Sequence, residues 1–345
     1  MACGLSGSNG GVRDGNNFFK IDLLKRPLEV SFFVNNICNL KCKHCYVGYN
    51  KKEDELTVEE WIKIFDKLIE MNALTFGNVG KEPLLSSEKT FKLLKYFAEK
   101  RKENLKIRFG FVTNGTLLNS SIAKQLEEIL PDYIDISLDG TQEVHDYIRG
   151  EGKFKITTEN LKNFPKKLKK KVFISFTLMR SNKDSFKEMV KELDKMDFKK
   201  FIISPYIKTP DSDGELYLEK EEVVEFYKQI IEGKVINFSN LSEIEILLKV
   251  DYDSQKELMD LLCKKNIIDL KKLLIDEYGV LFNLYEINNS KIIINYIPFS
   301  DTFSRAIRIS HDGYLSGCLE MFHEDYPIRA RGNLREEKIQ ELLIN

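Results

Sequence analysis

Short β-rich segments alternate with helical segments from residue 29 onward, and this alternation restricts the folds that the chain can adopt. The β-rich segments are near-continuous apolar runs, which is typical of parallel strands buried on both faces. Right-handed helical crossovers join such strands. An incomplete barrel and an open doubly wound sheet both satisfy the pattern. The six predicted strands cover residues 29–34, 73–79, 106–115, 133–140, 171–179 and 199–207.

Helical patterns fill the intervals between these strands. In the first of them, Thr57 and Glu60 have the spacing of a capping box ahead of an amphipathic stripe. The predicted helices of this part are 57–71, 87–100, 120–129, 155–164 and 181–196. After a loop-like segment, 208–218, the chain is predicted to form helices at 219–233, 242–249 and 254–277, strands at 280–287 and 291–297, and a tail with a strand, a turn and a short helix.

Composition excludes several classes of protein. The 345 residues include 53 basic and 54 acidic side chains, and the net charge of −1 argues against general nucleic-acid binding. No apolar run is long enough for a membrane span, and residues 1–28 form a Gly-, Ser- and Asn-rich lead-in without the apolar core of a signal peptide. The six cysteines do not suggest a disulfide framework, so we expect a reducing, cytoplasmic compartment.

Three cysteines, Cys38, Cys42 and Cys45, stand together just after the first predicted strand. Clustered thiolates are soft ligands that select zinc or an iron–sulfur cluster. A structural zinc site usually has four ligands in two pairs, and the sequence offers no second pair. Three thiolates on a [4Fe–4S] cluster leave one iron open to another ligand. We favour the cluster, with a zinc site or a buried apolar cysteine group as alternatives.

Four motifs resemble those of the radical S-adenosylmethionine (SAM) superfamily. The cysteine loop "CNLKCKHCY" has the superfamily spacing, and "GKEP" at 80–83 is similar to its Gly-Gly-Glu-Pro motif, with lysine in place of the second glycine. "TNG" at 113–115 ends the third strand, and "SLDGTQEVHDYIRG" at 137–150 resembles the fourth-strand segment of the branch that carries SPASM-type extensions. The strong resemblance covers about residues 29–207.

The resemblance implies a cofactor set and a role for each matching residue. It implies one [4Fe–4S] cluster on Cys38, Cys42 and Cys45, with SAM on the remaining iron. Asp139 and His145 are expected to organise their loop. The SAM contacts that it implies are His44 over the adenine, mainly through its backbone, Gly80, Lys81 and Glu82 at the amino group, Asn114 at the nucleoside, Ser137 and Arg149 at the carboxylate, and Thr177 at the ribose.

The tail departs from the family pattern. "RISHDGYLSGC" and "GNLRE" resemble the beginning and end of a SPASM domain, whose auxiliary clusters need several further cysteines. Only Cys318 follows the linker, so no auxiliary cluster is expected. Cys318 is either a small hydrophobic residue or a thiol that donates a hydrogen atom to a substrate radical, as in similar single-cysteine epimerases. Tyr314 is a second candidate for that donor.

The resemblance thus implies a fold and a function. The fold is a partial (βα)6 TIM-type barrel over 29–207, followed at 208–345 by a helical linker and a small α+β, SPASM-like cap. The function is reductive cleavage of SAM to a 5′-deoxyadenosyl radical that abstracts hydrogen from a peptide or natural product, epimerisation included. An external donor of the flavodoxin or ferredoxin type would supply the electron. The alternatives are redox or rearrangement chemistry on a sugar, nucleoside or other small metabolite, and, more remotely, a non-catalytic zinc-binding scaffold.

Overall fold

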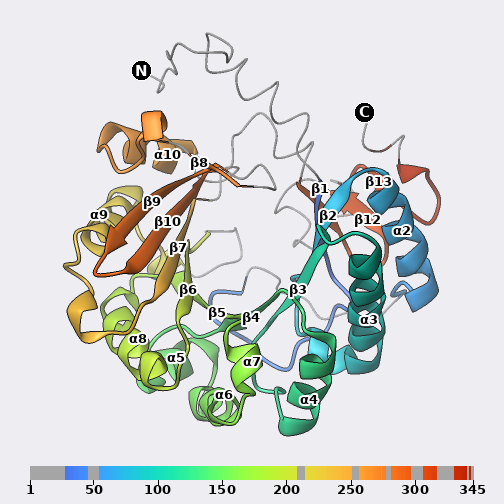
Figure 1. Ribbon diagram of the computed structural model, residues 1–345, viewed down its shortest axis with the longest axis horizontal. Helices are drawn as coiled ribbons and strands as arrows, with labels where there is room; N and C mark the ends of the chain where they lie inside the picture. The colour runs from blue at the N-terminus through green and yellow to red at the C-terminus, as the bar shows by residue number, and fades with distance from the viewer. Residues whose placement is uncertain are drawn as a thin grey trace.

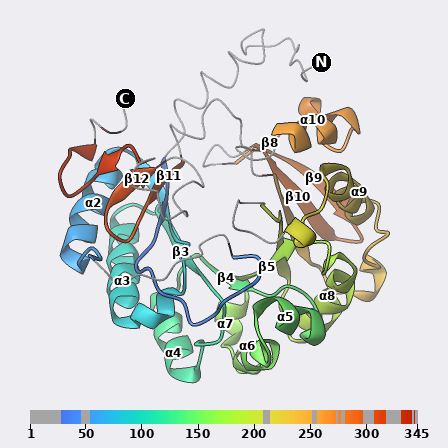
Figure 2. The ribbon, with the colours of Figure 1, turned by 180° about the vertical axis from the view of Figure 1, so that it is seen from behind.

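A curved α/β sheet with helices on its outer side forms the protein (Figures 1 and 2), as predicted. The computed structural model describes residues 28–45, 54–207, 214–250, 256–272, 274–276, 281–296, 306–316, 330–339 and 342. In this part of the chain the strand order is β13-β12-β11-β1-β2-β3-β4-β5-β6-β7-β10-β9-β8, and the two ends of the sheet do not pair with each other. The fold is therefore an open, barrel-like arc.

The six predicted strands are confirmed, and each pairs in parallel with the next. Because the strands are parallel, all their carboxyl ends meet at the same edge of the sheet, where the predicted site motifs also stand. The strands are β1 (Leu28–Phe32), β2 (Ala73–Asn78), β3 (Arg108–Thr113), β4 (Tyr133–Ser137), β5 (Val172–Leu178) and β6 (Lys200–Pro205).

The sheet continues past β6 with strands that the sequence patterns located only in part. The predicted helix at 242–249 is wrong, because this segment forms β7 (Glu245–Val250) and pairs in parallel with β6. In the folded sheet its buried residues, Ile246, Leu248 and Val250, recur at every second position, which is the period of a strand. The predicted hairpin is confirmed as β9 (Leu281–Ile287) and β10 (Ser290–Tyr296), with β10 parallel to β7.

The remaining strands lie at the two ends of the sheet. The predicted helix at 254–277 is shorter than expected and is followed by β8 (Leu274–Ile275), which pairs with β9. At the other end β11 (Ala306–Ile309) pairs in parallel with β1, and β12 (Tyr314–Ser316) and β13 (Gly332–Asn333) follow in antiparallel order. The sheet is continuous across residue 207, and the domain boundary at that residue stays a prediction.

Most helices begin where the sequence predicts. The Thr57 hydroxyl accepts a hydrogen bond from the Glu60 N–H at 3.1 Å, and the Glu60 carboxylate accepts one from the Thr57 N–H at 2.7 Å, which confirms the capping box. The helices are α2 (Val58–Glu70), α3 (Ser87–Glu103), α4 (Ser120–Ile129), α5 (Gln142–Arg149), α6 (Lys153–Lys162), α7 (Lys166–Lys169), α8 (Phe186–Lys195), α9 (Lys220–Ile231) and α10 (Lys256–Lys264). Single 3₁₀ turns occupy Pro83–Ser86, Lys183–Ser185, Gly214–Leu216, Phe238–Asn240 and Leu270–Lys272.

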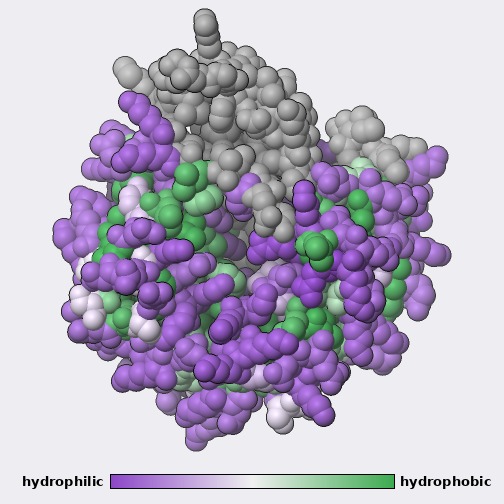
Figure 3. Space-filling view, viewed as in Figure 1, coloured by the Kyte–Doolittle hydropathy of each residue, from purple (hydrophilic) through white to green (hydrophobic). Residues whose placement is uncertain are grey.

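The outer helices present a polar exterior. On the face shown in Figure 3, hydrophilic residues predominate over the helical periphery. None of the helices in the described ranges has both the length and the apolar character that a membrane crossing requires.

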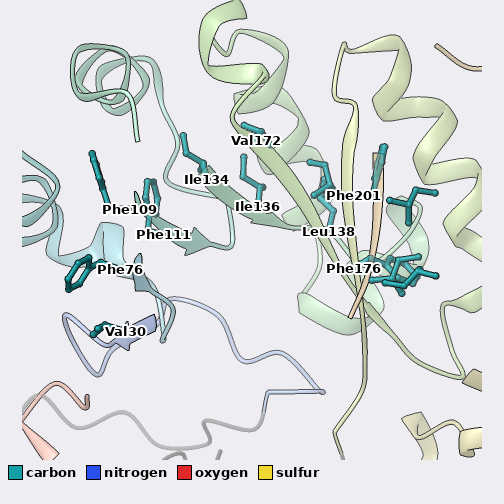
Figure 4. Packing of buried hydrophobic residues seen from close by; sticks show 14 of the residues in the cluster. Val30, Phe76, Phe109, Phe111, Ile134, Ile136, Leu138, Val172, Phe176 and Phe201 are labelled. Carbon is teal, nitrogen blue, oxygen red and sulfur yellow. The ribbon is translucent and has the colours of Figure 1, made fainter. Parts of the chain in front are cut away.

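The hydrophobic core lies between the outer face of the sheet and these helices (Figure 4). Phe32, Trp61, Phe65 and Phe97 form its aromatic centre, with the Trp61 and Phe65 rings stacked at 5.3 Å and the Phe65 and Phe97 rings 4.8 Å apart. All four side chains are almost completely buried. Burial of each such ring contributes about 2–3 kcal/mol. This core fixes β1 and therefore the start of the cysteine loop that follows it.

The inner face of the sheet differs from the prediction of strands buried on both faces. In β5 buried residues alternate with the half-buried Phe173, Ser175 and Thr177. Parallel strands covered by helices on both faces do not show such alternation. At β5 the concave face of the arc is therefore only partly covered, and the side chains of β5 on that face are polar or aromatic.

Two glycines on the inner face make room for one tyrosine. Gly77 on β2 pairs with Gly110 on β3, and Gly110 pairs with Tyr133 on β4. A Cβ at Gly110 would lie 2.3 Å from the Tyr133 carbonyl oxygen, and one at Gly77 would lie 2.5 Å from the Tyr133 hydroxyl oxygen. The Tyr133 ring therefore lies across both glycines. A Cβ at Gly110 would clash with backbone, whereas a Cβ at Gly77 would clash with a side-chain hydroxyl that can move.

We expect Gly110→Ala to destabilise the fold more than Gly77→Ala, by about 2 kcal/mol or more, because its methyl group meets backbone. Tyr133→Phe should rescue part of the Gly77→Ala loss and none of the Gly110→Ala loss. Denaturant unfolding of the single and double variants measures both couplings. Equal rescue of the two glycine variants would contradict this packing.

Candidate active site

The cysteine loop begins directly after β1. The Cys45 N–H donates to the Cys42 carbonyl at 3.1 Å, and the Leu40 N–H donates to the Cys38 sulfur at 3.4 Å. Burial raises the pKa of Cys38, and it raises the pKa of Cys42 to about 11. The Cys38 and Cys42 thiols are therefore protonated at neutral pH unless positive charge, such as that of bound metal, compensates their ionisation.

The donor set fits an iron–sulfur cluster better than a zinc ion. In the part of the chain that the structure describes, no three His, Cys, Asp or Glu side chains converge as ligands of one metal ion. A single zinc ion needs all its sulfur ligands within about 2.3 Å of one point. A [4Fe–4S] cluster binds each thiolate at a different iron, so its ligands stand farther apart. Cys38, Cys42 and Cys45 supply the type and number of ligands that such a cluster takes from one loop, and their role as its ligands stays a prediction.

Glu82 lies next to this loop and is completely buried. Its carboxylate accepts hydrogen bonds from the Thr113 hydroxyl at 2.9 and 3.0 Å, the Asn114 N–H at 2.9 Å and the Leu84 N–H at 3.1 Å. Its own N–H donates to the Ile37 carbonyl at 3.1 Å. Burial raises the pKa of Glu82 to about 7, although these hydrogen bonds oppose the rise. At neutral pH the Glu82 side chain is therefore only partly ionised, and it lies near Cys38, the first cysteine of the loop.

Asn114 joins the end of β3 to the cysteine loop. Its side-chain NH₂ donates to the Asn39 oxygen at 2.9 Å, and its oxygen accepts from the Thr116 hydroxyl at 2.6 Å. The Asn39 NH₂ donates to the same hydroxyl at 2.9 Å. Sequence reasoning missed Asn39, although an amide residue between the first two cysteines is a signal that it could have used.

A buried ion pair holds the opposite side of the loop. The Arg149 Nε donates to the Asp139 carboxylate at 2.6 Å, and the Thr177 N–H donates to the other Asp139 oxygen at 2.9 Å. Burial opposes ionisation of Asp139, but Arg149, His44, His145 and the Thr177 N–H together outweigh burial and lower the pKa of Asp139. The Asp139 N–H donates to His145 Nδ1 at 3.2 Å, so the expected organising role of both residues agrees with the geometry.

His44 points into this ion pair. Its Nε2 lies 3.4 Å from the Arg149 Nη2 and 3.7 Å from the Asp139 carboxylate. Burial lowers the pKa of His44 to about 4, so the imidazole is neutral at physiological pH. Its Nδ1 is buried and has no hydrogen-bond partner among the described residues. The predicted contact of His44 with adenine, mainly through its backbone, stays a prediction.

The other predicted residues lie at various distances from this network. Ser137 ends β4 and pairs with Ser175, and Thr177 is half-buried on β5. Gly80 packs so closely that a Cβ would lie 2.1 Å from the Phe33 ring. Tyr314 lies on β12, two strands from β1, and Cys318 lies outside the described residues. The roles predicted for these residues stay predictions.

Asp135 is a polar residue of the inner face that sequence reasoning did not single out. It lies on β4 between the positions of Tyr133 and Ser137 and is only 8% exposed. Burial raises its pKa to about 6, and Lys249 on β7 partly opposes the rise. An aspartate within an apolar strand, as in "YIDIS", is a signal that points to such a residue.

Residues 32–193 match the model of the Radical SAM superfamily. The chain contains a radical SAM domain. This match covers the cysteine loop, Glu82, Asn114 and the Asp139–Arg149 pair. The predicted superfamily is confirmed, and the SPASM-like nature of the tail stays a prediction.

The radical SAM domain is similar to parts of longer proteins. It is 33% identical to Fe-coproporphyrin III synthase of Methanosarcina barkeri over 46% of this chain and 38% of that protein. It is 31% identical to mycofactocin maturase MftC of Mycolicibacterium smegmatis over 48% of this chain and 41% of that protein. The chain thus spans about two fifths of the length of these curated relatives.

A solved structure shares the fold over nearly the whole chain. Streptococcus suis SuiB bound to its precursor peptide SuiA matches with a TM-score of 0.68 at 14% identity, over 98% of this chain and 73% of that one. At 14% sequence identity, this structural likeness shows a shared fold and nothing more.

Removal of the Asp139 charge should destabilise the domain strongly, because it leaves the Arg149 guanidinium buried without a counter-charge. We expect Asp139→Asn to cost about 3 kcal/mol in the free energy of unfolding. The double variant with Arg149→Met should lose less than the sum of the single losses. Denaturant unfolding of the three variants measures the coupling, and additive losses would rule out a paired role.

Asp135 should make stability depend on pH. Its pKa of about 6 lies above the value of about 3.9 in the unfolded chain, so stability falls as pH rises from about 4 through 6. We expect Asp135→Asn to gain up to about 3 kcal/mol at pH 7 and almost nothing at pH 4. Asp260→Asn on the exposed side of α10 is the matched control. Denaturant unfolding at pH 4 and pH 7 measures the gain in stability of each variant. An equal gain from Asp135→Asn at both pH values would contradict the raised pKa of Asp135.

Proposed function

We propose that this chain is a radical SAM enzyme that modifies a peptide or a related natural product. One observation carries the proposal: the three-cysteine loop is hydrogen-bonded to the Glu82 segment through Ile37 and to α5 through Lys43. These contacts are the Glu82 N–H to Ile37 carbonyl bond at 3.1 Å and the Lys43 N–H to Ile148 carbonyl bond at 2.9 Å. They join the loop that carries the three thiols to the segments that carry the Glu82 carboxylate and the Arg149 guanidinium, at the carboxyl edge of the sheet.

Each of these residues then has a defined task. Cys38, Cys42 and Cys45 hold the cluster, and Glu82 accepts hydrogen bonds from the SAM amino group. The remaining SAM contacts are those of the predicted set: the His44 backbone, Gly80, Lys81, Asn114, Ser137, Arg149 and Thr177. The bound cluster and SAM supply a 5′-deoxyadenosyl radical that removes a hydrogen atom from the substrate. The half-covered inner face of the sheet positions that substrate.

A peptide is the favoured substrate for two reasons. One relative of the domain is a mycofactocin maturase, and SuiB, which shares the fold, was solved with a precursor peptide. For epimerisation, the Cys318 thiol would give its hydrogen atom to the substrate carbon radical. The resulting thiyl radical would regain one electron from the external flavodoxin- or ferredoxin-type donor and one proton from solvent. Tyr314 is the second candidate for this step.

A small metabolite is the second candidate substrate. The observation that favours it is the 33% identity with Fe-coproporphyrin III synthase, which acts on a tetrapyrrole by its name. Redox or rearrangement chemistry would then replace epimerisation. Incorporation of solvent deuterium into a peptide, lost in Cys318→Ala, would support the first candidate and exclude the second.

The test of the proposed function uses anaerobically reconstituted protein with SAM and dithionite. We expect about four irons and four sulfides per chain and release of 5′-deoxyadenosine. Cys38→Ala should lose both, whereas Glu82→Gln should keep the iron and sulfide but lose SAM binding and release at least 100-fold less product. Cys263→Ala, on α10 outside the loop, is the matched cysteine control and should behave as wild type.

Two outcomes would contradict the proposal. Zinc without sulfide in the wild-type protein would favour the zinc-binding scaffold. A complete cluster that never cleaves SAM would exclude radical chemistry while leaving the metal ligands intact.

A further inference from the structure

Lys81 occupies a backbone conformation that suits a glycine better than a lysine. Its φ is +54°, in the left-handed region where a Cβ carries a steric cost. Glycine adopts this conformation freely, and the family motif has glycine at this place. A strained residue persists when its surroundings enforce the conformation, and such strain often marks a functional side chain. The lysine side chain is therefore the feature to explain.

The two neighbours of Lys81 enforce this conformation. On one side, Gly80 packs against the Phe33 ring, leaving no room for a Cβ. On the other side, the Glu82 N–H donates to the Ile37 carbonyl at 3.1 Å, one residue before Cys38. Lys81 is thus held between two contacts with the segment that connects β1 to the first cysteine, and its half-buried side chain starts beside the metal ligands.

The Lys81 ammonium lies within electrostatic reach of two of the three sulfurs. Burial lowers the pKa of Lys81, and Cys45 and Cys38 act in the opposite direction. Lys81 in turn stabilises the thiolate of Cys38 against the effect of burial. On the other side of the loop, Cys42 faces Arg149, but the Arg149 charge is already shared with Asp139 at 2.6 Å. Among the residues that the structure describes, Lys81 is the positive charge that favours ionisation of Cys38.

We propose that Lys81 sets the reduction potential of the iron–sulfur cluster held by Cys38, Cys42 and Cys45. The inference rests on the proposed function. When the external donor passes one electron to the cluster, the cluster gains one negative charge and the donor is oxidised. A fixed ammonium nearby stabilises the reduced form more than the oxidised form, which raises the potential. The Lys81 charge thus makes the cluster easier to reduce by a weak physiological electron donor.

The test is a redox titration of the reconstituted cluster without SAM, followed by electron paramagnetic resonance. At the wild-type midpoint potential, Lys81→Met should lower the ratio of reduced to oxidised cluster about tenfold, a shift of about 59 mV for one electron. Lys81→Arg keeps the charge and should keep the midpoint. Lys81→Gly removes both charge and strain, so it should shift the midpoint as Lys81→Met does while increasing resistance to denaturant.

Lys41→Met is the matched control, because Lys41 is exposed on the same loop and directly precedes Cys42. It should leave the midpoint unchanged. A wild-type midpoint in Lys81→Met, or an equal shift in Lys81→Arg and Lys81→Met, would overturn the role of the Lys81 charge. A wild-type protein that assembles no cluster would instead overturn the proposed function itself.

Discussion

One buried carboxylate, Asp139, connects the parts on which the site depends. It follows β4, accepts the Arg149 Nε from the last turn of α5 and the Thr177 N–H from β5, and lies 3.7 Å from the His44 ring of the cysteine loop. A buried charge is tolerable only when it is paired and hydrogen-bonded, and each partner here comes from a different element. The requirement to satisfy one charge therefore fixes the relative positions of two strands, a helix and the loop.

The sheet supplies the frame around that carboxylate. Its outer face is closed by helices over a continuous aromatic and aliphatic core, whereas its inner face carries half-buried polar residues such as Ser175 and the buried Asp135. The two faces serve different purposes: the outer one provides the free energy of folding, and the inner one remains available for a ligand. The carboxyl edge, where both faces meet, holds the cysteine loop.

Much of this arrangement could be predicted from sequence, because local patterns encode it. The six strands, the Thr57 cap and the loop of Cys38, Cys42 and Cys45 are all contiguous signals. Segment 242–249 was misassigned because its strand depends on pairing with β6, which no local window contains. Asn39 and Asp135 stand at unusual polar positions of the sequence, but the partners of the first and the burial of the second arise only in the folded sheet. The contacts of SAM and the place of Cys318 stay predictions.

The pairing of β11 with β1 gives the chain a particular order of assembly. Glu29 on β1 is in register with Ala306 on β11, so the strand that leads into the cysteine loop completes its pairing only after β11 has been synthesised. Until then one edge of β1 offers unpaired backbone groups to other chains, next to the cysteine loop. Pairing with β11 then satisfies that edge. The strand at 306–309 thus completes the sheet beside the cysteine loop, although the two segments are far apart in the sequence.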